Sequence, residues 1–182
     1  MNPPHAGQRI ALGGIRVFCP VRHAASLGRG QDEHRDLPRG RGLVDADGGE
    51  PRDQLRPEFR ATGGHPGGDW AGTPIILIHH IGARSGIERV TPLGYLPLGG
   101  DRFAVVASNG GSPSHPAWYH NLKANPVITA EVGARTLTVV AEELDDTARA
   151  ELWPALVARF PTVGTHQAAT ARQIPVFILA AA

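Results

Sequence analysis

The sequence has little cysteine and no long apolar run. Cys19 is the only cysteine among 182 residues, which excludes an intrachain disulfide and a metal site built from several cysteines. The net charge of +1 provides no basic surface of the kind that binds nucleic acid. The longest apolar run, residues 74–81 (PIILIHHI), has the length of a strand and falls far short of the roughly 20 residues that span a bilayer. We therefore expect a cytoplasmic protein that does not bind nucleic acid.

The chain divides near residue 56 into two parts of different composition. Residues 1–56 are rich in Gly, Pro, Arg and Asp and show no sustained period of 2 or 3.6. Such a segment buries too little apolar surface to offset the loss of conformational entropy on folding. We predict a disordered or non-native extension over 1–56, with a partner-binding tail as the alternative, and a folded domain over 57–182.

The second part alternates between short apolar runs and turn residues, which predicts strands joined by tight connections. Six strands are predicted, at residues 75–81, 88–96, 102–107, 127–132, 135–141 and 174–179. Helices are predicted at 57–62, 117–124 and 148–160, the last with Asp146 or Thr147 as its N-cap. Six strands with two or three helices predict an α+β fold that is mainly β, a small antiparallel barrel.

Two arginines bracket the first predicted turn. Arg84 and Arg89 lie within residues 82–93 (GARSGIERVTPL), and each guanidinium offers a fixed fork of donors to phosphate or carboxylate oxygens. Ser85 and Gly86 between them offer backbone N–H groups and close approach to a ligand. These features favour an anion-binding turn, although two solvated arginines would give the same pattern.

Two further segments are candidates for a ligand site. Ser108 opens a Ser-Asn-Gly-Gly loop that follows a buried strand, so a hydroxyl and flexible amides lie at the end of the predicted barrel. Trp118 and Tyr119 open the next helix, with Asn121 nearby, and could wall a planar ring. The alternatives are an ordinary connecting loop and aromatic residues that pack in the core.

These segments together resemble the deazaflavin (coenzyme F420)-dependent nitroreductase and quinone reductase family. Residues 82–93 match its G-x-[KR]-[ST]-G-x-x-R-x-x-P-L motif, and 106–111 (VASNGG) and 115–126 (HPAWYHNLKANP) match its next two blocks in order. Residues 58–60 (EFR) and 174–177 (IPVF) complete the match. The resemblance implies a flavin-reductase-like split β-barrel with reduced F420 as hydride donor and a quinone, nitroaromatic or enone-type acceptor.

The resemblance also implies which residues form the site. Ser108 and His166 are the implied catalytic residues, His166 as a donor of a proton or hydrogen bond. The implied coenzyme-binding residues are Ala83, Arg84, Ser85, Arg89, Val90, Thr91, Pro92, Leu93, Ala107, Ser108, Asn109, Ala117, Trp118, Tyr119, His120 and Asn121. Relatives that reduce nitro compounds carry tyrosines after the last helix, where this chain has Phe160, Val163 and His166. A quinone or enone acceptor is therefore as plausible as a nitro compound.

The sequence gives less support to other kinds of site. His79 and His80 are neighbours on a predicted strand, so their side chains point to opposite faces and cannot share one metal ion. No G-x-S-x-G elbow or G-x-G-x-x-G turn indicates a hydrolase or a Rossmann nucleotide site. An FMN-binding barrel and a non-catalytic coenzyme or lipid carrier remain as alternatives.

The sequence leaves the assembly and the surroundings of the protein open. The expected partner is a small-molecule electron acceptor, the chain is a monomer or homodimer, and peripheral contact with a membrane is possible. Lys123 is the only lysine, and the abundance of Arg, Ala, Gly and Pro indicates a GC-rich, actinobacterial source.

Overall fold

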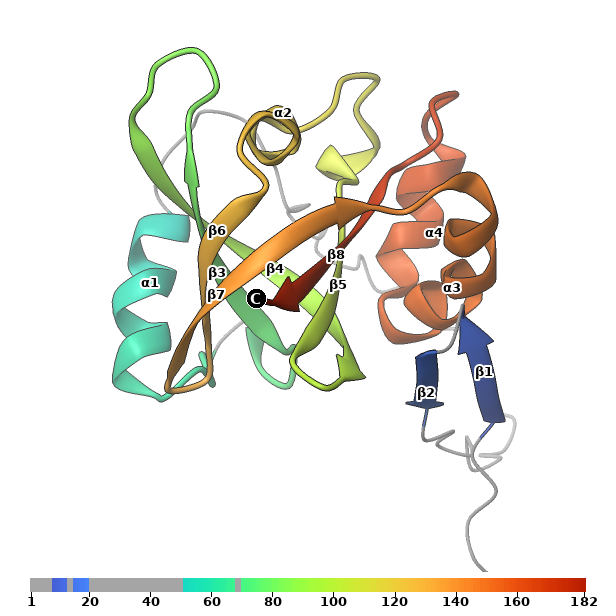
Figure 1. The fold of residues 1–182 in the computed structure, drawn as a ribbon, viewed down its shortest axis with the longest axis horizontal. Helices are drawn as coiled ribbons and strands as arrows, with labels where there is room; N and C mark the ends of the chain where they lie inside the picture. Colours follow the sequence, from blue (N-terminus) through green and yellow to red (C-terminus); the bar gives the residue numbers. More distant parts are fainter. Residues whose placement is uncertain (1–7, 13–14, 20–50, 68–69) are drawn as a thin grey trace, which may run out of the picture.

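The computed structural model describes residues 8–12, 15–19, 51–67 and 70–182, and its centre is a closed antiparallel barrel (Figure 1). The strands are neighbours in the order β3-β4-β5-β8-β7-β6. Their bounds are β3 Ile75–Ile81, β4 Glu88–Gly99, β5 Arg102–Val106, β6 Val127–Val132, β7 Arg135–Glu143 and β8 Val176–Ala181. The predicted six-stranded barrel is confirmed, although β4 continues past residue 96 through an irregularity in its pairing with β5.

Strand β3 shows why its sequence is apolar almost without alternation. Ile76 and Ile78 pack in the barrel interior with residues such as Phe103 and Phe177. The intervening Ile75 and Leu77 are also buried, because a helix covers the outer face of this strand. A strand that is covered on both faces needs apolar residues at every position, which is the pattern of residues 75–78.

The covering helix is α1, Pro51–Ala61, which packs Phe59 against the outer face of β3. The helix begins six residues before the predicted start at residue 57, so Pro57 lies inside it and not in its first turn. Further toward the N-terminus, β1 (Gln8–Leu12) pairs with β2 (Ile15–Cys19) as an antiparallel hairpin that the sequence pattern did not predict. The boundary at residue 56 stays a prediction.

On the opposite side, α3 (Asp146–Arg159) packs on β4, β5 and β8, and α4 (Pro161–Ala168) lies beside α3 (Figure 1). Asp145, and neither Asp146 nor Thr147, caps α3, because its carboxylate accepts a hydrogen bond from Ala148 N at 2.8 Å. Helix α4 was not predicted. It begins with Pro161 directly after α3 ends, because proline at the first turn gives up no hydrogen bond. No helix in the described ranges is long and apolar enough to cross a membrane.

An ion-pair cluster fastens α1 to the barrel. Arg60 donates two hydrogen bonds to the carboxylate of Glu131 on β6, at 2.9 Å from Nε and 2.6 Å from Nη2. His79 on β3 lies between this carboxylate, at 2.6 Å, and that of Glu88, at 2.9 Å. Hydrogen bonds from Arg60 are the main cause that lowers the pKa of Glu131 to about 2.

We expect Glu131→Gln to lower the free energy of unfolding at pH 7 by about 1 to 2 kcal/mol. This figure is smaller than the pKa shift alone would give, because Arg60 is half exposed and solvent screens the ion pair. The folded-state pKa of Glu131 lies below its unfolded value, so its contribution is complete above about pH 5 and is lost as the pH falls toward about 2. Urea denaturation at pH 7, 4.5 and 3 tests this. Glu142→Gln, on the exposed face of β7, should change stability little, and an equal loss in both variants would contradict the assignment.

Candidate functional site

Three predicted segments meet at one end of the barrel, which we call the loop rim. It consists of the β3–β4 turn (82–87), the loop from β5 (107–116) and helix α2 (Ala117–Ala124), drawn at the top of Figure 1. Because neighbouring strands run antiparallel, the end of β3, the start of β4 and the end of β5 must share this end. Segments that are distant in the sequence thus come together at this end of the barrel.

A buried chain of hydrogen bonds crosses the loop rim. Asn121 on α2 accepts a bond from Ala83 N at 2.8 Å through Oδ1, and its Nδ2 lies 2.9 Å from Nδ1 of His80. Nε2 of His80 lies 2.9 Å from Oγ1 of Thr91 on β4. Asn121 and His80 are only 6% and 2% exposed. The chain of bonds therefore fixes the 82–87 turn against α2 and β4.

This chain of bonds determines the state of His80. The amide Nδ2 of Asn121 can only donate, so Nδ1 of His80 accepts and Nε2 carries the proton that is donated to Thr91. Burial, together with the charge of Arg89 directly across the β3–β4 pair, lowers the pKa of His80 to about 4. His80 is therefore a neutral structural group at physiological pH. His79 lies on the outer face, so the prediction that the two histidines point to opposite faces is confirmed.

The turn itself offers free cationic donors. Arg84 and Arg89 are exposed, and no carboxylate in the described ranges lies within ion-pair distance of either guanidinium. Gly86 has a φ of +67° and open space around it. Ser85 is also exposed, and its Oγ accepts a bond within the turn from Ile87 N at 3.3 Å. Unpaired guanidinium groups at an exposed turn fit a phosphorylated, acidic coenzyme.

The predicted residues of β4 divide between two faces. Thr91 belongs to the buried chain of bonds and Leu93 packs against the barrel interior. Val90 packs under α1 on the outer face, so its side chain does not face the loop rim. Pro92 is buried. Only the backbone of Val90 could thus contact a ligand there.

The Ser108 loop is held by Arg172, a residue that the sequence reasoning missed. The guanidinium donates to the backbone oxygens of Ser108 at 2.7 Å, Ala107 at 3.1 Å and Ser112 at 2.8 Å. Asn109 bonds within the loop, from Nδ2 to Ser114 O at 3.0 Å, and so does not extend toward a phosphate. The sequence does not mark Arg172, because the backbone carbonyls that accept its hydrogen bonds lie 60 to 65 residues away.

The predicted residues on α2 have different surroundings. Ala117 and His120 are exposed on the helix surface. Trp118 is 3% exposed and packs against Phe177 in the barrel core, so core packing accounts for its side chain. Tyr119 is half-buried and donates from its hydroxyl to the carboxylate of Glu143 at 3.3 Å. Of the two aromatic residues that the sequence predicts beside a planar ring, only Tyr119 could still contact it.

His166, predicted as catalytic, lies on α4 beside the Ser108 loop. Gly111, with a φ of +81°, packs so closely on this helix that an added Cβ would lie 3.0 Å from the backbone oxygen of His166. Phe160 is partly buried on the α3 side, and Val163 is 7% exposed and points into the protein. The catalytic role of His166 stays a prediction.

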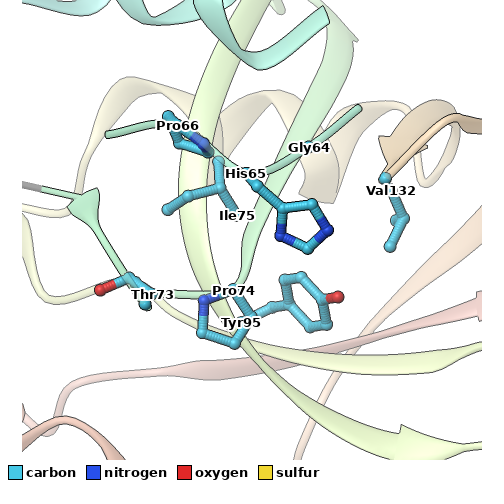
Figure 2. A pocket seen from close by; sticks show the side chains of 10 residues that line it. Gly64, His65, Pro66, Thr73, Pro74, Ile75, Tyr95 and Val132 are labelled. Carbon is cyan, nitrogen blue, oxygen red and sulfur yellow. The ribbon is translucent and has the colours of Figure 1, made fainter. Parts of the chain in front are cut away.

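A cavity lies at the other end of the barrel, away from the loop rim. It has a volume of about 400 Å³ and is lined by the β6–β7 turn and by the α1–β3 connection. Figure 2 shows the rings of His65 and Tyr95 on facing sides of it. None of the predicted coenzyme-binding residues lines this cavity. The chemistry of the loop rim, and not the size of this cavity, therefore identifies the candidate site.

Comparisons with known proteins agree with the motifs. A family model described as F420H(2)-dependent quinone reductase matches residues 52–181. The F420H(2)-dependent quinone reductase of Mycobacterium tuberculosis is 38% identical over 125 residues, which are 66% of this chain and 83% of that protein. A solved F420-H2 dependent reductase is 41% identical with a TM-score of 0.53, covering 58% of this chain and 93% of its own.

A second solved structure, described as a domain-swapped dimer, is 35% identical with a TM-score of 0.56, covering 70% of this chain and 94% of its own. The family resemblance predicted from the sequence and the split-barrel fold are thereby confirmed, and the mycobacterial relative agrees with an actinobacterial source. The chain belongs to the F420H(2)-dependent quinone reductase family.

Proposed function

We propose that the loop rim binds reduced F420 and brings it against a quinone, which is reduced to the quinol. The observation that carries this proposal is the convergence of the exposed Arg84–Arg89 turn with the Ser108 loop and α2. When bound, the coenzyme supplies the hydride, so the protein needs no nucleophile of its own. An FMN cofactor is not favoured, because the family is F420H(2)-dependent.

The residues have separate tasks in this proposal. Arg84 and Arg89 hold the acidic, phosphorylated tail through charge-assisted hydrogen bonds. Asn121 and His80 keep the turn in one conformation, so that the two guanidinium groups need little reordering when the coenzyme binds. Ser108 and the loop that Arg172 holds orient the ring and acceptor and exclude water.

A quinone is preferred to a nitroaromatic acceptor. Residues 160–166 contain no tyrosine. Val163 of this stretch is buried, so Phe160 and His166 are left to contact an acceptor. The curated relatives are named for quinone reduction. Steady-state reduction of menadione and of a nitroimidazole by the same preparation would compare the two acceptors.

We expect Arg84→Ala and Arg89→Ala each to weaken binding of oxidised F420 about tenfold or more, because each removes a charge-assisted bond to the coenzyme tail. Fluorescence titration measures the dissociation constant, and a parallel titration with FMN should show weaker binding. Arg135→Ala serves as the matched control, since this half-exposed arginine pairs with Asp101 at the opposite end of the barrel.

Unchanged F420 affinity in both turn variants would refute the placement of the coenzyme tail. Binding without turnover of menadione would instead favour the carrier alternative. The oligomeric state, monomer or homodimer, stays a prediction. Sedimentation of the purified protein would decide between the two. One solved relative is described as a domain-swapped dimer.

A further inference from the structure

His115 stands just before α2 and has no task in the function proposed above. Its half-buried ring stacks on Tyr119, with centroids 4.1 Å apart and planes 15° from parallel. Its Nδ1 lies 3.2 Å from Nη1 of Arg172, the arginine that also holds the backbone oxygen of Ser108 at 2.7 Å. One guanidinium therefore fixes both the Ser108 loop and the imidazole of His115.

The contact with Arg172 determines where the proton of His115 lies. A guanidinium has only donors, so Nδ1 of the imidazole must accept and the proton must be on Nε2. Burial, and then the positive charge of Arg172, lower the pKa of His115 below its ordinary value, with a smaller effect of His120; Glu143 acts in the opposite direction. The ring is consequently a neutral donor at physiological pH.

The Nε2–H group has no acceptor among the residues that the structure describes. Stacking on Tyr119 and the bond to Arg172 both restrict the ring to one orientation. An oriented, neutral imidazole N–H beside a planar-ligand site is suited to polarise a carbonyl oxygen, as in enzymes where a neutral histidine acts as an electrophile. In this role the imidazole donates a hydrogen bond and does not transfer its proton.

We propose that Nε2–H of His115 donates a hydrogen bond to a carbonyl oxygen of the bound reactants, belonging either to the quinone acceptor or to the deazaflavin ring. The inference rests on the proposed function and adds a residue to it. His115 stays neutral, while the quinone takes up a hydride from the reduced coenzyme and one proton from solvent to form the quinol. Arg172 acts as the positioning residue that fixes the tautomer.

The test compares His115→Phe with His115→Gln. The phenyl ring retains the stacking on Tyr119 but has no donor or acceptor, whereas the carboxamide can accept from Arg172 and still donate. We expect kcat/KM for menadione to fall about tenfold to a hundredfold in the Phe variant and to stay within about fivefold of wild type in the Gln variant.

Two binding measurements separate the carbonyl sources. If the oxygen belongs to the quinone, the F420 dissociation constant of the Phe variant stays within about twofold of wild type; if it belongs to the ring, that constant rises with the loss of activity. In ¹⁵N-labelled wild type without coenzyme, NMR should show a protonated Nε2 and an unprotonated Nδ1 for His115. That readout does not depend on turnover.

Three results would overturn the inference: a proton on Nδ1, equal losses in both variants, or activity and F420 affinity within about twofold of wild type in the Phe variant. Equal losses would mean that His115 only packs against Tyr119. Failure of the proposed function is distinct, because wild type itself would then neither bind F420 nor reduce menadione.

Discussion

Asn121→Ala should lower the free energy of unfolding by about 3 kcal/mol and weaken F420 binding as well. The substitution removes the acceptor for Ala83 N and the donor to the buried His80, and leaves the imidazole Nδ1 without a partner. The 82–87 turn then loses its attachment to α2, so the arginines at that turn must be ordered by the coenzyme itself. Urea denaturation and F420 titration measure the two effects.

Asn125→Ala is the matched control, because this asparagine ends the same helix on the protein surface and its side chain makes no hydrogen bond in the described structure. It should change stability by less than about 0.5 kcal/mol. Comparable losses in both variants would show that the helix, and not the buried chain of bonds, accounts for the effect.

The same chain of bonds predicts an acid-sensitive stability. The pKa of His80 is about 4 in the folded protein and near its ordinary value of 6.5 in the unfolded chain. The unfolded state therefore binds the proton first, and up to about 3 kcal/mol of stability is lost as the pH falls from 6.5 to 4. Asn121→Asp should reduce this loss, because a carboxylate beside the imidazole raises the pKa of His80.

Arg172→Ala should be the second severe substitution, with a loss of about 3 to 4 kcal/mol in the free energy of unfolding. The guanidinium makes bonds to three backbone oxygens of the Ser108 loop and to His115, and all of them lose a donor. Hydrogen exchange of residues 107–116 should accelerate, and menadione reduction should fall because this loop belongs to the proposed site. Arg172→Lys should recover little, since a single ammonium cannot reproduce the planar fork.

Arg102→Ala controls for the loss of an arginine on the same barrel. Arg102 begins β5 at the end away from the loop rim, and no side-chain hydrogen bond of this residue is found in the described structure. It should leave the exchange of the 107–116 amides unchanged. If Arg172→Ala leaves that exchange unchanged too, the arginine does not hold the loop.

The strands and the coenzyme motif could be predicted because their causes are local. A run such as residues 75–81 is β-branched and ends at Gly82, which is enough to indicate a buried strand and a turn. Helix α4 escaped prediction because Pro161 and Gly164 weaken any helical pattern. Local propensity alone does not favour this helix. In the folded protein it packs closely against Gly111 of the Ser108 loop.

The sequence by itself determined the barrel class, the Arg84–Arg89 turn and the family, because these depend on neighbouring residues and on spacing. Only the tertiary structure decided which polar side chains hold the loop rim together. Asn121 and Arg172 act on partners 38 to 65 residues away, several of them backbone atoms. A backbone carbonyl or amide is present at nearly every position, so no residue type in the sequence marks it as a partner.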